Sequence, residues 1–197
     1  ATSDYIVKLD SLKIAIGQSA GFAGQNNDAI AVGTQAGSQA QGDKSVAIGR
    51  FAATQLQGST AVAIGNDAGR FGQNNNAVSV GANAGRQGQG SRSVAFGANA
   101  GSQAQGSSSV SIGYQAGQTG QNDNAVSVGV NAGNEAQGTG AVSIGQLAGQ
   151  TGQNNYSVSV GLSAGRQGQA TNSVAIGRLA ACQAQGSAAV SIGYQVG

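Results

Sequence analysis

One glycine recurs every sixteen residues along almost the whole chain, without an insertion or a deletion. The twelve anchor glycines are Gly17, Gly33, Gly49, Gly65, Gly81, Gly97, Gly113, Gly129, Gly145, Gly161, Gly177 and Gly193. A period this strict is typical of a repeat protein, in which each unit forms one structural turn that packs on its neighbours. The sequence therefore predicts one elongated repeat region over residues 11–197. Residues 1–10 lie outside the repeat and form an N-terminal capping strand.

The residues before each anchor glycine alternate as they do in a β-strand. Valine, isoleucine or, once, phenylalanine stands three positions and one position before the anchor, and alanine or serine always stands between them. This alternation predicts a strand with one bulky face and one flat face. We expect the bulky face to fill the core. In five consecutive units the inward residues would be Val46, Ile48, Val62, Ile64, Val78, Val80, Val94, Phe96, Val110 and Ile112.

The residues after each anchor predict a second, shorter extended segment with small inward side chains. Glutamine stands eight positions after the anchor in every unit: Gln25, Gln41, Gln57, Gln73, Gln89, Gln105, Gln121, Gln137, Gln153, Gln169 and Gln185. We expect these side-chain amides to hydrogen-bond along the stack as a ladder. Corners rich in glycine and asparagine supply the positive φ angles that tight turns need.

Each unit therefore forms one coil of an all-β, parallel β-solenoid with about two strands per coil. The positions one, two, five and six after the anchor vary widely, which indicates contact with solvent or with a partner. A coil this thin buries little apolar surface by itself. We expect the flat alanine and serine face to pack against another copy, which gives a homo-oligomer with its axis parallel to the stack.

Composition excludes several kinds of chemistry. The chain has no histidine and one cysteine, Cys182, so Cys/His metal sites, histidine-dependent nucleophilic catalysis and an intramolecular disulfide are ruled out. A formal net charge of +2 is too small for nucleic-acid binding by phosphate neutralisation. No apolar run is long enough for a membrane helix.

The acidic residues of the repeat, scattered over different columns, are Asp28, Asp43, Asp67, Asp123 and Glu135. We expect no enzyme activity, catalytic residue, cofactor or metal.

The strand motif resembles the head repeat of trimeric autotransporter adhesins, the YadA-like bacterial surface proteins, whose heads repeat N-S-V-A-I-G. Asn172–Gly177 has this sequence, and Lys44–Gly49 and Thr60–Gly65 differ from it at one or two positions. The resemblance extends from about Lys13 to the end of the chain. It implies a left-handed β-roll, three chains around a common axis, and adhesion to host or matrix surfaces. Similar repeats occur in viral and phage fibres.

Two classes of function follow. The first is an extracellular surface or fibre protein of the adhesin-head type, which binds a host receptor, matrix or glycan through its variable columns. The alternative is a purely structural, self-assembling filament or a viral or phage fibre segment. No neck, heptad stalk or anchor strands accompany the repeat, so the mode of anchoring stays open, as do the ligand, the source and the role of Cys182.

The two ends of the chain differ in their patterns. Strand-forming residues at Tyr5–Leu9 predict a strand that covers the open edge of the first coil. The sequence stops at Tyr194–Gly197, in the middle of a unit. We expect either that more chain follows in the native protein, or that Tyr5–Leu9 pairs with the last coil of the next molecule and subunits grow head to tail into a fibre.

Overall fold

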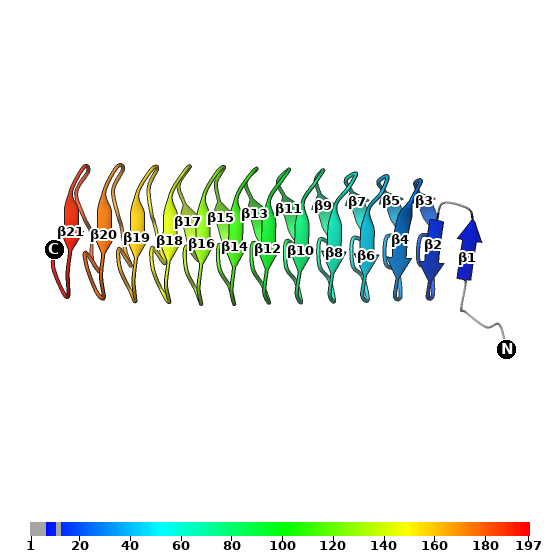
Figure 1. Cartoon of the computed structure of the whole chain (residues 1–197), viewed down its shortest axis with the longest axis horizontal. Helices are drawn as coiled ribbons and strands as arrows, with labels where there is room; N and C mark the ends of the chain where they lie inside the picture. The colour runs from blue at the N-terminus through cyan, green and yellow to red at the C-terminus, as the bar shows by residue number, and fades with distance from the viewer. Residues whose placement is uncertain (1–6, 11–12) are drawn as a thin grey trace.

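The chain winds into a rod of stacked coils, with its first and last described coils at opposite ends (Figure 1). The computed structural model describes residues 7–10 and 13–197, and in these ranges it contains only strands, turns and irregular segments. Each sixteen-residue unit makes one coil, and equivalent residues of successive coils lie side by side. The predicted parallel β-solenoid is confirmed.

One wall of the rod is a sheet of thirteen strands, sheet A. In spatial order they are β1 (Val7–Asp10), β2 (Lys13–Ile16), β4 (Ala29–Val32), β6 (Val46–Ile48), β8 (Val62–Ile64), β10 (Val78–Val80), β12 (Val94–Phe96), β14 (Val110–Ile112), β16 (Val126–Val128), β18 (Val142–Ile144), β19 (Val158–Val160), β20 (Val174–Ile176) and β21 (Val190–Ile192). From β2 to β21 all neighbours are parallel, and every residue pairs with its equivalent sixteen positions later, as Ser79 does with Ala95.

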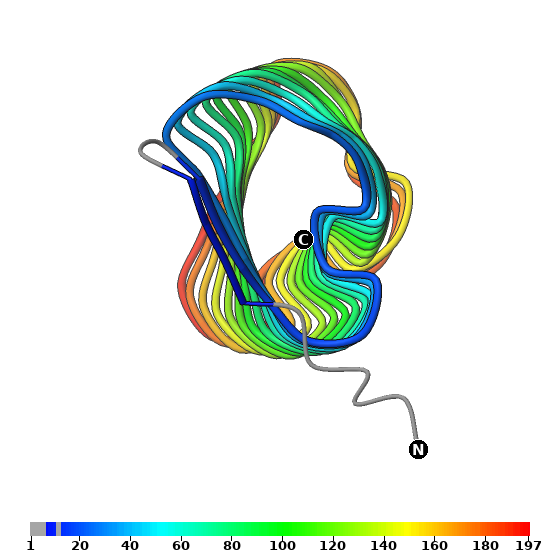
Figure 2. The same cartoon turned by 90° about the vertical axis from the view of Figure 1, so that its right-hand side faces the viewer.

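A second wall, sheet B, has eight shorter parallel strands. They are β3 (Ala23–Gln25), β5 (Gln39–Gln41), β7 (Gln55–Gln57), β9 (Phe71–Gln73), β11 (Gln87–Gln89), β13 (Gln103–Gln105), β15 (Thr119–Gln121) and β17 (Glu135–Gln137). Beyond β17 the pairing continues as single bridges, for example between Thr151 and Gln167. The view along the rod shows the coils stacked one behind another, each displaced slightly from the one before it (Figure 2).

The strand β1 runs antiparallel to β2 and forms the outer edge of sheet A. Val7 pairs with Ile16, and Asp10 pairs with Lys13. Backbone groups of β2 that would otherwise form an unpaired edge are therefore hydrogen-bonded. Tyr5 and Ile6, the first residues of the expected capping strand, lie outside the described residues.

The core is the reverse of the one expected from the strand pattern. The small residue between the two bulky ones points inward, and Ala31, Ala47 and Ser79 have no exposed surface. The bulky residues lie on the outer face, where Ile48 is 37% exposed and Phe96 is 54% exposed. The inward assignment was therefore wrong for Val46, Ile48, Val62, Ile64, Val78, Val80, Val94, Phe96, Val110 and Ile112, all of which are only half-buried or are exposed.

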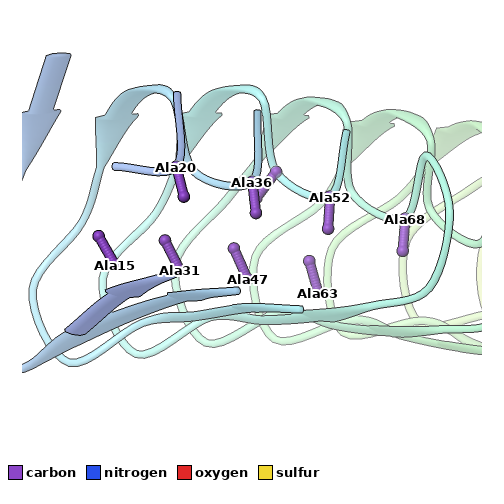
Figure 3. Packing of buried hydrophobic residues seen from close by; sticks show 9 residues of the cluster. Ala15, Ala20, Ala31, Ala36, Ala47, Ala52, Ala63 and Ala68 are labelled. Atoms are coloured by element: carbon purple, nitrogen blue, oxygen red, sulfur yellow. The ribbon is translucent and has the colours of Figure 1, made fainter. Parts of the chain in front are cut away.

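The reason is the narrow interior of the coil. Figure 3 shows Ala15, Ala31, Ala47 and Ala63 on one wall facing Ala20, Ala36, Ala52 and Ala68 on the other, and all eight are buried. A coil of sixteen residues also has several sharp corners. In one coil Gly33, Gln35, Gly37, Ala40 and Lys44 all have positive φ angles. Only small side chains fit between walls that lie so close together.

The anchor glycines allow the coils to stack in contact. Their φ angles lie between 122° and 135°, a range that residues with a Cβ rarely adopt. A Cβ added at Gly65 would lie 2.6 Å from the carbonyl oxygen of Gly81 in the next coil. Any other residue at this position would both strain the backbone and force neighbouring coils apart.

The inverted core predicts which alanines tolerate enlargement. Ala63→Val places two extra carbons in the filled interior and should lower the free energy of unfolding by about 1–3 kcal/mol. Ala98→Val is the matched control, because Ala98 is half-buried in a column where Val130 already occurs, and it should change stability by less than about 0.5 kcal/mol. Denaturant unfolding of both variants measures the difference. A larger loss for Ala98→Val than for Ala63→Val would contradict the inside-to-outside assignment.

Candidate functional site: an apolar outer face

Two columns of branched side chains cover the outer face of sheet A from one end of the rod to the other. The column three positions before the anchor consists of half-buried valine and isoleucine, except for Val190, which is exposed. The exposed large residues one position before the anchor are Ile16, Ile48, Ile64, Phe96, Ile112, Ile144, Ile176 and Ile192. With a strand spacing of about 4.8 Å, the eleven steps from β2 to β21 give a stripe roughly 53 Å long.

This apolar stripe, defined by the two columns, becomes wider toward the middle of the rod. One position after the anchor, the units near the N-terminus carry Thr34, Arg50 and Asn66. Farther along, the same column presents Tyr114, Val130 and Leu162, which are 50%, 42% and 40% exposed, with the polar Gln146 between the last two. Contiguous exposed apolar surfaces are typical of protein interaction sites, so this stripe is the candidate site.

The interior holds a polar network rather than a binding site. The glutamine eight positions after the anchor is buried in every unit from Gln25 to Gln185. The Nε2 of Gln89 donates to the carbonyl of Val78 at 2.9 Å, and the equivalent bond recurs from Gln25 to Gln185. The amides also bond to one another, as in the 3.0 Å contact from Gln73 Nε2 to Gln89 Oε1. The glutamine ladder predicted from the sequence is confirmed.

Serine at the inward strand position completes this network. Ser79 Oγ donates to Gln89 Oε1 at 2.5 Å, and Ser111 makes the same bond to Gln121. The serine also accepts from the glutamine of the preceding coil, as Ser79 does from Gln73 Nε2 at 3.2 Å. Sequence reasoning placed these serines on an outer, flat face and so missed their role, although their regular spacing from glutamine was visible.

Alanine at the same position leaves the glutamine incompletely bonded. Within the part of the chain that the structure describes, the Oε1 atoms of Gln41, Gln57 and Gln105 are buried and lack a hydrogen-bond donor. In these three coils the inward strand residue is Ala31, Ala47 and Ala95, respectively. In these three coils neither a serine hydroxyl nor the amide of the preceding glutamine donates to the oxygen, whereas Gln73, opposite Ala63, accepts from Gln57 Nε2 at 3.2 Å.

This difference predicts that Ala95→Ser stabilises the protein. The new hydroxyl would donate to Gln105 Oε1, and the free energy of unfolding should rise by about 0.5–1.5 kcal/mol. The opposite change, Ser127→Ala, removes the donor to Gln137 Oε1 and should cost about 1–3 kcal/mol. Thermal and denaturant unfolding of the two variants provides the check. A destabilising Ala95→Ser would show that the hydroxyl does not join the network.

The acidic side chains do not converge. In the described ranges, no three or more His, Cys, Asp or Glu residues lie close enough to hold a metal ion. Asp67 forms a 2.8 Å ion pair with Arg70, and Asp43 and Asp123 accept hydrogen bonds from turn backbone N–H groups. Cys182 is a half-buried free thiol. No helix among the described residues is long and apolar enough to cross a membrane.

Comparison with known proteins adds no relative. A scan against protein-family models, a search of curated proteins and a search of solved structures each give no match. The functional argument therefore depends on the surface of this chain.

Proposed function

We propose that this protein is an extracellular surface or fibre protein of the adhesin-head type. It acts as a rigid homo-oligomeric rod, and its variable columns bind a host, matrix or glycan surface. The observation that carries the proposal is the apolar stripe on sheet A, which runs the length of the rod while the other outer columns vary in size, polarity and charge.

The stripe supports association between copies of the chain. Covering the exposed two-fifths of an isoleucine such as Ile112 contributes on the order of 0.6–1.2 kcal/mol. Because the stripe repeats over twelve coils, the sum can offset an association cost on the order of 4–15 kcal/mol. A surface that repeats similar apolar side chains at every step can pack against the same surface of other copies that run parallel around a symmetry axis.

The oligomer therefore uses a different face from the one expected. The flat alanine and serine face lies inside the coil, so it is not available to another chain. The bulky Val/Ile face takes its place. The proposed arrangement is a homotrimer with its axis parallel to the rod, as the resemblance to the adhesin heads implies, and with sheet A of each copy facing that axis.

A charge in the stripe should dissociate the assembly. Ile112→Asp places a carboxylate at the centre of the proposed interface, where burying an unpaired charge is costly. The variant should sediment as a folded monomer, because Ile112 is 40% exposed in the single chain. Gln103→Asp, on an exposed position of sheet B, serves as the control and should keep the wild-type mass.

Analytical ultracentrifugation and light scattering measure the mass of the intact protein and both variants. A wild-type monomer at high concentration would contradict the oligomer. An unlimited filament in images of the wild type would favour the structural alternative over a discrete head.

Adhesion is tested separately from assembly. Beads coated with the intact protein should bind immobilised matrix proteins or fixed cells more than beads coated with a control protein. Since the ligand-binding columns lie outside the stripe, the folded Ile112→Asp variant should retain binding to at least one of these surfaces. Absence of binding to every surface would leave a rod without an adhesive role and would refute the proposal.

A further inference from the structure

Charge is strongly segregated along the rod. Five of the nine Lys and Arg residues but only one acidic residue, Asp67, lie in residues 44–92. Residues 93–165 contain no Lys or Arg, and their acidic residues are Asp123 and Glu135. We call the first segment the basic belt. A chain with a net charge of only +2 thus concentrates its positive potential in about three neighbouring coils.

Aromatic rings contact two arginines of the basic belt, Arg50 and Arg70. The guanidinium of Arg70 lies 4.8 Å from the ring centre of Phe51 and 4.7 Å from that of Phe71, so it is in contact with both rings. Arg50 lies 4.5 Å from the same Phe51 ring. Stacking on a ring fixes the plane of a guanidinium and leaves its N–H edge directed sideways, which suits recognition of a planar or tetrahedral anion.

These arginines have hydrogen-bonding capacity that the described residues do not fill. Arg70 donates to Asp67 through Nη1, while its Nε and the Nε of Arg86 are buried and have no acceptor within the described part of the chain. Arg70 and Arg86 occupy the same column in adjacent coils, and of these two arginines only Arg70 has an acidic partner, Asp67, in the described part of the chain. In the same column, Arg166 differs, because its Nε donates to Gln150 Oε1 at 3.0 Å.

A hollow on the surface leads away from this cluster. Starting at Arg70 and Phe71, it crosses the outer side of sheet B over Thr54, Gln55 and Gln39 and reaches Phe22, which is 76% exposed. Amide groups and an exposed ring beside a cation suit a ligand with many hydroxyl groups, apolar C–H faces and acidic substituents. A sugar chain with carboxylate or sulfate groups has this combination.

We infer that the basic belt binds an acidic polysaccharide, with Arg70 and Arg86 contacting its anionic groups and the hollow accommodating neighbouring sugar rings. This inference rests on the proposed adhesive function and assigns it a site and a ligand class. Nucleic acid fits less well, because its affinity depends on neutralising many phosphates and the belt has few cations.

The test uses substitutions that introduce a residue already found in the same column of other coils. Arg70→Gln and Arg86→Gln introduce the residue found in the same column at Gln118 and Gln150, and Phe71→Gln introduces the residue found at Gln55 and Gln87. Arg166→Gln removes the same charge from the same column outside the belt. Circular dichroism and thermal unfolding should show that all four variants keep the wild-type fold.

Isothermal titration calorimetry of the intact protein then uses five probes: heparin oligosaccharides, hyaluronan oligosaccharides, dextran sulfate, neutral dextran and oligodeoxythymidine. We expect at least one acidic polysaccharide to bind and neutral dextran not to bind. Binding should weaken as salt is raised.

Hyaluronan carries only carboxylates and dextran sulfate only sulfates, so their relative affinities identify the recognised group. Arg70→Gln and Arg86→Gln should each weaken binding by about tenfold or more, Phe71→Gln should weaken it measurably, and Arg166→Gln should not.

Three results would overturn the inference: no binding of any acidic polysaccharide, an equal loss in Arg166→Gln, or tighter binding of oligodeoxythymidine than of the polysaccharides. The two experiments distinguish an error in the proposed adhesive function from an error in this binding site. Coated beads that bind surfaces while the protein binds no acidic polysaccharide would refute this site alone. Polysaccharide binding by a protein whose beads bind no surface would refute the adhesive role alone.

Discussion

Backbone contact between successive anchor glycines is the constraint on which the rest of the structure depends. Each glycine lies so close to the next that a single added carbon would overlap its carbonyl group. The coils are held at this spacing, and each turns sharply at several residues with positive φ angles. The interior therefore admits only alanine, serine and the extended glutamine side chain. Valine and isoleucine are therefore displaced to the outside, and the apolar stripe on sheet A follows from a steric limit inside the coil.

The narrow interior is stabilised by hydrogen bonds as much as by apolar packing. A glutamine in every coil satisfies backbone carbonyls that face the core, and its amide links one coil to the next. Buried amides are costly when unpaired, so the position admits no simple apolar replacement. The inward strand residue has more freedom. Alanine fills the space and serine adds a hydroxyl, which explains why these two residues alternate irregularly while glutamine does not.

The sequence was sufficient to predict the period, the parallel in-register stacking, the strand before each anchor and the glutamine ladder, because all of these follow from spacing. It was not sufficient to predict which side of the strand faces inward. A strand such as Val78–Val80 alternates equally well in either orientation, and the usual preference for buried aliphatic residues favours the wrong one. The deciding quantity is the distance between the walls, which depends on corners formed by residues such as Gln35 and Lys44 that have no obvious preference for positive φ.

The candidate binding surface was only partly visible in the sequence. Variable columns indicated an outer surface, but the grouping of Arg50, Arg70, Phe51 and Phe71 depends on contacts between neighbouring coils and turns. Spacing alone also gave no sign that Arg70 and Arg166, which occupy the same column, have different surroundings. Their difference arises from the side chains that happen to stand one coil away.

The uniform register has a consequence for how such a rod changes in length. Removing or duplicating sixteen residues brings each remaining coil against a neighbour with the same backbone geometry, so the anchor contacts, strand pairing and glutamine bonds are all re-formed. The rod can therefore lengthen or shorten in steps of one strand spacing, about 4.8 Å. A change of any other number of residues would displace every later column. Recombination that adds or removes whole units would therefore change the distance between the basic belt and either end of the rod in steps of one coil.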